Sequence, residues 1–240
     1  MDLLQNLRSC ARPVIFETGN DDAPCSTAGT AFIVGFRKSV FIIMPRHVVG
    51  AWPVERIRIY PTWTSQYIFR YQNWWFIETT QEDSDTSDIL VIEADLNVPA
   101  GIGKNIKLLN LNNRENVVWY DERHDSQFFL CGFPTGQSVI DYSSLEINTS
   151  QYLLESVYKG DSPSSWCHMI EVKNPLSLDH FGGLSGAPVF SHRIDKAAGT
   201  PGRFCGMVLR GTATSGYIHF LAVEVLMTAL SEIEDSKRNM

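Results

Sequence analysis

The amino-acid sequence predicts an all-β protein built in two halves, and three observations lead to this prediction. Short segments rich in β-branched and aromatic residues follow one another after Pro13, beginning with PVIFE, TAFIVGF and SVFIIM. Clusters of turn-forming residues such as TGNDDAP and FRKS separate these segments, which is typical of barrels and sandwiches. The segment 96–105, LNVPAGIGKN, contains one proline and two glycines and is the best candidate for a boundary between the halves.

The expected elements follow in chain order. A short helix is predicted in DLLQNLRSC, and about six strands follow between residues 12 and 95. Beyond the boundary, about six more strands lie between residues 106 and 220, among them SQFFLCGF, WCHMIEV and FCGMVLRG. The segment 221–237 has a helical period that places Leu226, Leu230 and Ile233 on one side, so it predicts a closing helix.

Composition narrows the class of protein. The chain has 240 residues, of which 44% are hydrophobic, and this suffices for a single domain with a sizeable core. Its net charge of −7 argues against broad binding to nucleic acids or anionic membranes. The sequence starts without the apolar core of a signal peptide and has no long apolar run, so we expect a cytoplasmic protein. Five scattered cysteines without a CxxC pair predict neither a disulfide framework nor a zinc site.

Ser185 lies in an unusual segment, HFGGLSGAPVF, where small residues surround a single serine. Such a segment suits an ordinary turn between strands as well as a nucleophile. The nucleophile elbow of the α/β-hydrolases is excluded, because Ala187 replaces its second glycine and the strand pattern of the chain is wrong for that fold.

Two other residues favour the nucleophile. His47 directly follows an apolar strand in FIIMPRHVVG, and Asp88 directly precedes the apolar run at residues 89–92. A carboxylate at the mouth of a buried strand is costly unless a partner binds it, and an imidazole N–H is such a partner. The order His, Asp, Ser, with separations of 41 and 97 residues, matches the chymotrypsin arrangement, in which they are about 45 and about 93. The sequence therefore predicts a catalytic triad of His47, Asp88 and Ser185.

Over nearly its whole length the chain resembles the trypsin-like (chymotrypsin-fold) serine peptidases. It is closest in texture to the intracellular bacterial members of the HtrA type, here without a PDZ domain. MPRHVV stands at the histidine motif, SDILVIEAD at the aspartate motif and GGLSGAPVF at the serine motif. Pro45 and Arg46 depart from the family, which usually has a pair of small residues before its histidine.

The resemblance implies one domain of two six-stranded antiparallel β-barrels of chymotrypsin type, with short N-terminal and C-terminal helices. The first barrel is expected at about 12–95, the linker at about 96–105, the second barrel at about 106–220 and the last helix at about 221–237. The active site is expected in the cleft between the barrels.

The resemblance also assigns roles around Ser185. The backbone N–H groups of Gly183 and Ser185 are expected to form an oxyanion hole. Leu184 stands where secreted relatives have the acid that pairs with a newly cut N-terminus, so zymogen-type activation is not expected.

Substrate recognition is expected on two segments. Asp179, six residues before Ser185, stands where trypsin-like members select arginine or lysine at P1. The strand containing Leu209, Arg210 and Gly211 is expected to pair with the substrate backbone, with Gly211 keeping the pocket entrance open.

These features together predict a serine endopeptidase that hydrolyses peptide bonds through an acyl-enzyme, with a basic P1 preference. The alternative is a catalytically silent trypsin-fold module that binds peptides or proteins. We expect a protein or peptide substrate and a dedicated regulatory or target protein, with no cofactor, metal, nucleic acid or membrane. DERHD at residues 121–125 is interpreted as a solvated loop rather than a metal site, and Glu82, Asp83 and Asp85 are also interpreted as a solvated loop.

Overall fold

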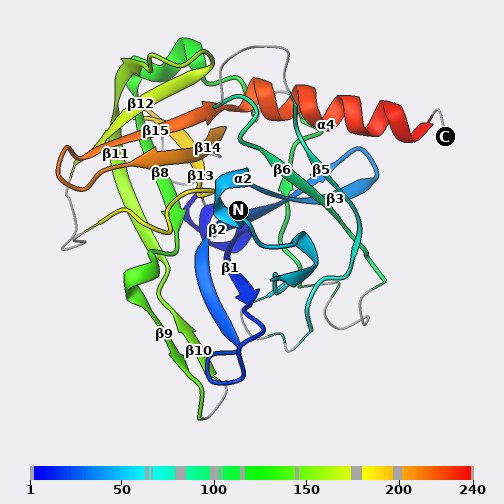
Figure 1. Ribbon diagram of the computed structural model, residues 1–240. Coiled ribbons are helices and arrows are strands. Elements are labelled where there is room, and N and C mark those ends of the chain that lie inside the picture. Colours follow the sequence, from blue (N-terminus) through cyan, green and yellow to red (C-terminus); the bar gives the residue numbers. More distant parts are fainter. Residues whose placement is uncertain are drawn as a thin grey trace.

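The computed structural model has two β-rich halves that lie side by side, with a helix near each end of the chain (Figure 1). It describes residues 3–62, 65, 67–78, 85–97, 103, 105–113, 117–143, 146–173, 180–196 and 202–238. The predicted all-β class is confirmed at this level.

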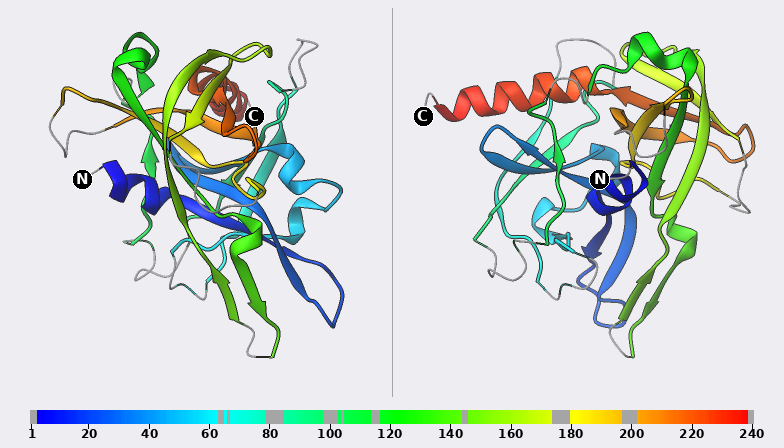
Figure 2. Two further views of the ribbon diagram at one scale, coloured as in Figure 1. Left: turned by 90° about the vertical axis from the view of Figure 1, so that its left-hand side faces the viewer. Right: turned by 180° about the vertical axis from the view of Figure 1, so that it is seen from behind.

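The first half is a seven-stranded sheet in which six strands follow the order β4-β1-β2-β3-β6-β5, and β7 pairs with β2. Its strands are β1 (Ala11–Glu17), β2 (Cys25–Phe36), β3 (Ser39–Met44), β4 (Ile57–Arg58), β5 (Tyr71–Phe76), β6 (Leu90–Ala94) and β7 (Leu109–Asn110). The sheet curls strongly, as the two further views make clear (Figure 2).

The predicted closure of the first barrel is not seen, because no ladder joins β4 to β5 in the described residues. One backbone hydrogen bond links the segments next to them, from the N–H of Phe69 to the carbonyl of Ile59 at 3.0 Å. Pro61 follows two residues later and has no N–H to continue such a ladder. The first half is therefore a curled half-barrel.

The second half is a closed barrel of six strands in the order β11-β12-β15-β14-β13-β8. These strands are β8 (Ser126–Gly132), β11 (Tyr152–Asp161), β12 (Cys167–Val172), β13 (Pro188–Arg193), β14 (Arg203–Gly211) and β15 (Tyr217–Ala222). A separate hairpin of β9 (Ser138–Asp141) and β10 (Glu146–Thr149) projects from it (Figure 1). Within the described residues there are also short 3₁₀ helices at Val54–Arg56, Tyr120–Asp125 and Thr135–Gln137.

The boundary between the halves lies slightly later than predicted. Leu109 in β7 pairs in parallel with Val34 in β2, and the N–H of Leu111 bonds to the carbonyl of Gly35 at 3.0 Å. Residues 109–111 thus extend the first sheet, although the sequence assigned them to the second barrel.

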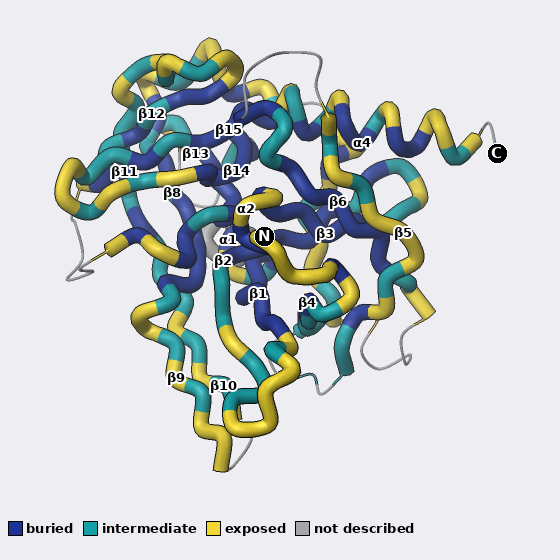
Figure 3. Tube along the Cα trace, in the orientation of Figure 1, coloured by how far each residue is buried: buried dark blue, intermediate teal, exposed yellow. Residues whose placement is uncertain are grey.

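The helices are α1 (Leu3–Cys10), α2 (Arg46–Val49) and α4 (Val223–Arg238). Both predicted terminal helices are confirmed, and α4 buries Leu226, Leu230 and Ile233 as its period predicted. Exposed and buried residues alternate along this helix in Figure 3. None of the helices seen in the described part of the chain has the length and apolarity needed to cross a membrane.

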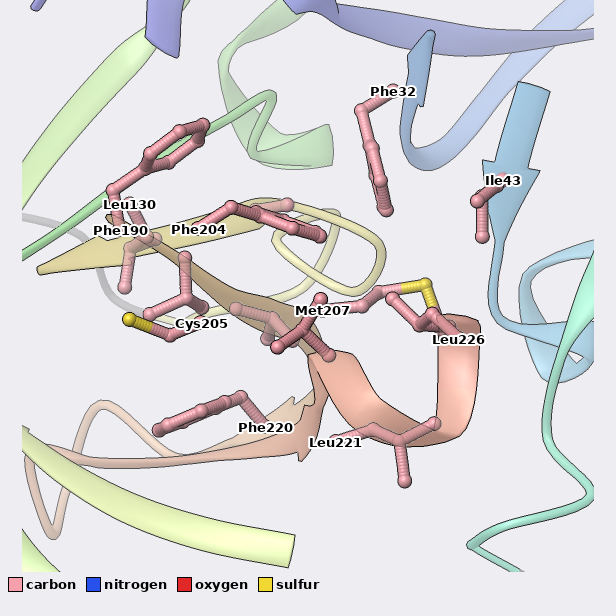
Figure 4. Packing of buried hydrophobic residues seen from close by; sticks show 14 of the residues in the cluster. Phe32, Ile43, Leu130, Phe190, Phe204, Cys205, Met207, Phe220, Leu221 and Leu226 are labelled. Carbon is pink, nitrogen blue, oxygen red and sulfur yellow. The ribbon is translucent and has the colours of Figure 1, made fainter. Parts of the chain in front are cut away.

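One apolar core joins the two halves. Phe32 of the first sheet contacts Phe204 of the barrel, with ring centroids 5.5 Å apart. Figure 4 shows Phe32 and Ile43 facing Met207 and Leu226 across this junction. All four side chains are fully buried, so the two halves are joined by a closely packed apolar interior.

Candidate active site

His47 and Asp88 are brought together by two neighbouring strands. β3 and β6 are antiparallel, and Met44 at the end of β3 lies opposite Leu90 at the start of β6. The chain after β3 and the chain before β6 therefore leave the sheet at the same edge. α2 begins there and carries His47, while Asp88 comes two residues before β6.

The two residues form a tight pair. Nδ1 of His47 lies 2.5 Å from Oδ2 of Asp88, and the backbone N–H of His47 donates to Oδ1 at 2.8 Å. Since a carboxylate only accepts, Nδ1 carries the proton and Nε2 is the basic nitrogen. The His47 side chain is 48% exposed against 18% for Asp88, so solvent and ligands reach the imidazole. This is the orientation that a general base requires.

Ser185 lies in the turn before β13, and this turn contacts the segment that carries His47. A Cβ built on Gly186 would lie 3.0 Å from Cδ of Pro45, two residues before His47. On the other side of the histidine, Val48 and the carbonyl of Ser185 both lie within 3.2 Å of the Cβ position of Gly29. The predicted triad residues therefore come from segments in direct contact.

Thr30 on β2 fastens the turn, a role that the sequence did not reveal. Its hydroxyl donates to the carbonyl of Gly183 at 2.8 Å and accepts from the N–H of Phe133 at 3.0 Å. Its own N–H donates to the carbonyl of Ser185 at 2.9 Å. Because Thr30 is fully buried, these bonds hold the turn of the second half against the first sheet.

Some backbone N–H groups of the turn have no hydrogen-bond acceptor among the described residues. The amides of Leu184, Gly186 and Ala187 donate to the carbonyls of Phe181, Val208 and Leu184, respectively. By contrast, the N–H groups of Gly183 and Ser185 make no hydrogen bond in the described part of the chain. The N–H of Gly182 likewise makes no hydrogen bond within these residues. The resemblance assigned Gly183 and Ser185 to an oxyanion hole, and that assignment stays a prediction.

The direction of the Gly183 amide follows from its peptide plane. The carbonyl of Gly182 accepts from the N–H of Thr135 at 3.0 Å, so it points toward that segment. In a trans peptide the following N–H points the opposite way, and the N–H of Gly183 is therefore turned away from Thr135. Gly183 has φ of 90°, a conformation that glycine adopts without strain.

The Ser185 hydroxyl donates to the backbone carbonyl of Leu209 at 2.8 Å rather than to His47. Leu209 is bulged, because Val208 and Arg210 pair with consecutive residues of β15 while Leu209 is skipped. A bulge redirects the local backbone, as is frequent near functional sites. The described residues include no hydrogen bond between His47 and Ser185.

Arg210 forms an ion pair across the two halves. Its guanidinium Nη1 contacts Oδ1 of Asp85, whose side chain is only 11% exposed. The interpretation of Asp85 as part of a solvated loop is therefore wrong. Two residues separate it from Asp88, and this short spacing is the one sequence signal that both carboxylates serve the same region.

Two groups at this ion pair have shifted pKa values. The hydrogen bond from Arg210 holds the pKa of Asp85 below its usual value. Burial, together with the charge of Arg210, lowers the pKa of His219, which is bonded to Ser162 at 2.9 Å. The strand expected to pair with substrate thus has a charged residue anchored to the first half.

Replacing Asp85 with asparagine is expected to lower the free energy of unfolding by about 1–2 kcal/mol at pH 7, since it removes a charge-assisted hydrogen bond. A carboxylate with a lowered pKa stabilises the folded state above its unfolded pKa of about 3.9, and this contribution disappears as the pH falls through the folded pKa. Urea denaturation should therefore show a difference between variant and wild type at pH 7 that becomes smaller when the pH is lowered to 2. Asp22→Asn, at an exposed position, should show no difference at either pH.

The remaining predicted site residues have different outcomes. Asp179 lies outside the described residues, so its position at the base of a specificity pocket stays a prediction. Leu184 is buried in the core, where it packs against Gly132. Gly211 does not border open space, because a Cβ there would lie 2.9 Å from Cγ1 of Ile218 and 3.2 Å from Cδ2 of Phe181. Apolar side chains thus fill the side to which a Cβ would point, and the expected pocket entrance at Gly211 stays a prediction.

Comparison with known proteins does not assign the chain to a family. No protein-family model matches the sequence, and no curated protein matches it either. The residues of the site are thus the basis for any functional proposal.

Proposed function

We propose that the protein is a serine endopeptidase with His47, Asp88 and Ser185 as its catalytic triad and a chymotrypsin-type arrangement of its two halves. The observation that carries this proposal is the His47–Asp88 pair, in which a carboxylate 41 residues away binds both Nδ1 and the backbone N–H of a half-exposed histidine. This leaves Nε2 as the base beside the segment that carries Ser185. The curled sheet and the closed barrel, with the site where they meet, support the same fold.

The chemistry begins with the serine. Its side chain rotates away from the carbonyl of Leu209, and Oγ attacks the substrate carbonyl carbon while Nε2 of His47 takes the hydroxyl proton. The negative charge that develops on the substrate oxygen is stabilised by the N–H groups of Gly183 and Ser185. Because these two amides have no acceptor in the described chain, they bind the oxyanion without first breaking another bond.

Collapse of the tetrahedral intermediate gives the acyl-enzyme. The peptide C–N bond breaks, and His47 returns its proton to the leaving amine. Water then attacks the acyl group with His47 again as the base, and the acid product and free serine are released. Asp88 holds the imidazole in the required tautomer and stabilises the imidazolium that forms in each half of the cycle.

A fluorophosphonate probe tests this proposal without knowledge of the substrate. Oγ of Ser185 is expected to bond to phosphorus and displace fluoride, which labels the wild-type protein covalently. Labelling should be lost in Ser185→Ala and in His47→Ala. Matched controls are Ser236→Ala and His192→Ala, which remove one serine on α4 and one histidine on β13, and both should label as wild type does.

Two results would contradict the enzyme. One is labelling that persists in Ser185→Ala, which would place the nucleophile elsewhere. The other is a folded wild-type protein that does not react under any condition, in which case the module that binds peptides without cleaving them would be favoured. In such a silent module, the Ser185 hydroxyl would stay hydrogen-bonded to the carbonyl of Leu209.

A further inference from the structure

Arg46 directly precedes the proposed general base His47, and its side chain is exposed. Its backbone N–H donates to the carbonyl of Asp88 at 3.3 Å, so its main chain is bonded to the residue that holds the histidine. Neither the proposed triad nor the proposed oxyanion hole uses the guanidinium of Arg46.

The ring of Phe76 positions this guanidinium. Phe76 ends β5 and lies opposite Leu90 of β6. Leu90 in turn lies opposite Met44 of β3, so the three residues form one row across neighbouring strands, at the edge of the sheet where α2 begins (Figure 1). Cζ of Arg46 lies 4.8 Å from the centroid of the Phe76 ring, which is a cation–π contact. The charge of Arg46 is therefore held at the same edge as His47.

The guanidinium donors of Arg46 have no partner in the part of the chain that the structure describes. Two other arginines of the first half also lie over aromatic rings, but both have partners. Arg37 pairs with Asp235, and Arg56 donates to a backbone carbonyl, that of Thr18. Among these three stacked arginines, Arg46 is thus the one whose donors remain available.

The carboxylates described just before β6 do not neutralise Arg46. Asp88 binds His47, and Asp85 binds Arg210. Arg46 also makes no ion pair with any other described acid. A positive charge therefore lies beside the proposed general base and is open to an acidic ligand.

Stacking on a ring leaves the donors of an arginine free to bind. The guanidinium is planar and its five N–H groups lie in that plane, while the ring covers only one face. A carboxylate accepts two of these N–H groups side by side without displacing the ring. Phe76 is 39% exposed and the His47 side chain 48%, so this edge of the site is accessible to a substrate.

We propose that Arg46 selects substrates with an aspartate or glutamate within three residues of the scissile bond, a span of about 10 Å in an extended chain. The substrate carboxylate accepts from the Arg46 guanidinium, while His47 and Ser185 act on the nearby peptide bond. This inference rests on the proposed peptidase function and adds a substrate class, acidic segments of proteins or peptides. The basic P1 preference expected from Asp179 concerns a different subsite, on the segment that carries Ser185.

Digestion of a proteome-derived peptide library, with mass spectrometry of the products, tests the proposal. We expect aspartate and glutamate to be enriched at one position within three residues of the cleaved bond. Two fluorogenic peptides that differ only in glutamate or glutamine at that position then give a ratio of kcat/KM values. This ratio is expected to be about 10 in favour of glutamate for the wild-type protein, as for a charge-assisted hydrogen bond partly exposed to water. Since both substrates are measured on one protein, the ratio does not depend on its overall activity.

Variants of the arginine and of its ring should change the ratio in a graded way. Arg46→Gln should lower it to about 1, and Arg46→Glu should make a peptide with lysine at this position the best substrate. Phe76→Leu keeps the arginine but removes the ring, so it should lower the ratio part of the way. The matched control is Arg70→Glu, which reverses an exposed charge at the opposite end of β5 and should keep the wild-type ratio. Circular dichroism checks that each variant is folded.

Three results would overturn the selection by Arg46 and leave the peptidase intact. One is a protein that reacts with the fluorophosphonate probe but shows no acidic enrichment. The second is an Arg46→Gln protein that keeps the wild-type ratio, and the third is an equal loss of the ratio in Arg46→Glu and Arg70→Glu. A folded wild-type protein that neither reacts with the probe nor cleaves the library would instead overturn the proposed function, and the acidic selection with it.

Discussion

Replacing Asp88 with asparagine is expected to reduce the rate of covalent labelling and of peptide-bond hydrolysis about 10⁴-fold. The side chain keeps its shape, and its remaining oxygen still accepts from the backbone N–H of His47. The amide group, however, donates where Oδ2 now accepts from Nδ1. His47 must then place its proton on Nε2 to avoid a clash of two donors, and in that tautomer it does not accept the proton of Ser185.

The second-order rate constant of fluorophosphonate labelling gives this measurement, and hydrolysis of fluorescein-labelled casein gives an independent one. Asp95→Asn is the matched control, because Asp95 adjoins the other end of β6, where its carboxylate accepts from the N–H of Asn97. The control should label at the wild-type rate. An Asp88→Asn protein that keeps more than a tenth of the wild-type rate would remove Asp88 from the triad.

The part of the site that could be predicted from sequence is the part set by strand ends. His47 and Asp88 each adjoin an apolar strand, and two neighbouring antiparallel strands bring such flanking residues to the same edge. The 2.5 Å contact between them therefore follows from the local pattern together with their order in the chain. The resemblance of the Ser185 segment to a known motif assigned the N–H groups of Gly183 and Ser185 to an oxyanion hole, and this assignment stays a prediction.

Thr30 and Asp85 could not be predicted in this way. Thr30 reads as one more β-branched residue of a strand, and its role arises only because the turn containing Gly183 packs against it from 153 residues away. Asp85 pairs with an arginine 125 residues later, in the other half of the protein. Contacts between residues so far apart in the sequence depend on how the two halves pack against each other. The hydrophobic periodicity of the sequence does not contain this information.

The first sheet stays open for a local reason that is visible in the sequence, although the prediction of a closed barrel did not take it into account. Closure needs a continuous ladder between the segments after β4 and before β5. Pro61 lacks the N–H that such a ladder uses, and β4 itself contains only two residues. The number of strands expected in this half, about six between residues 12 and 95, agrees with β1 to β6. The predicted number of strands in this half thus agrees with the structure, whereas the predicted closure into a barrel does not.

The second large effect is expected from Gly183→Ala, which should lower the labelling rate about 10²- to 10³-fold. A Cβ at this position would lie 2.3 Å from the carbonyl oxygen of Phe133 and 2.5 Å from the N of Thr135. Both are backbone atoms, so the turn itself must move. This shift is expected to rotate the Gly183 peptide and to move its N–H away from the place proposed for the oxyanion. The φ of 90° adds strain of about 1–3 kcal/mol, which urea denaturation should detect.

Gly160→Ala separates the loss of the oxyanion donor from a general loss of stability. Gly160 also has a positive φ, of 133°, but nothing lies within 4 Å of its Cβ position, and it is on β11, remote in sequence from the turn. This variant should lose stability and still label at the wild-type rate. If Gly183→Ala instead labels like Gly160→Ala, its N–H does not act in the transition state, and the two unpaired amides need another explanation. If only Gly183→Ala labels slowly, glycine is required at position 183 for catalysis as well as for packing of the turn.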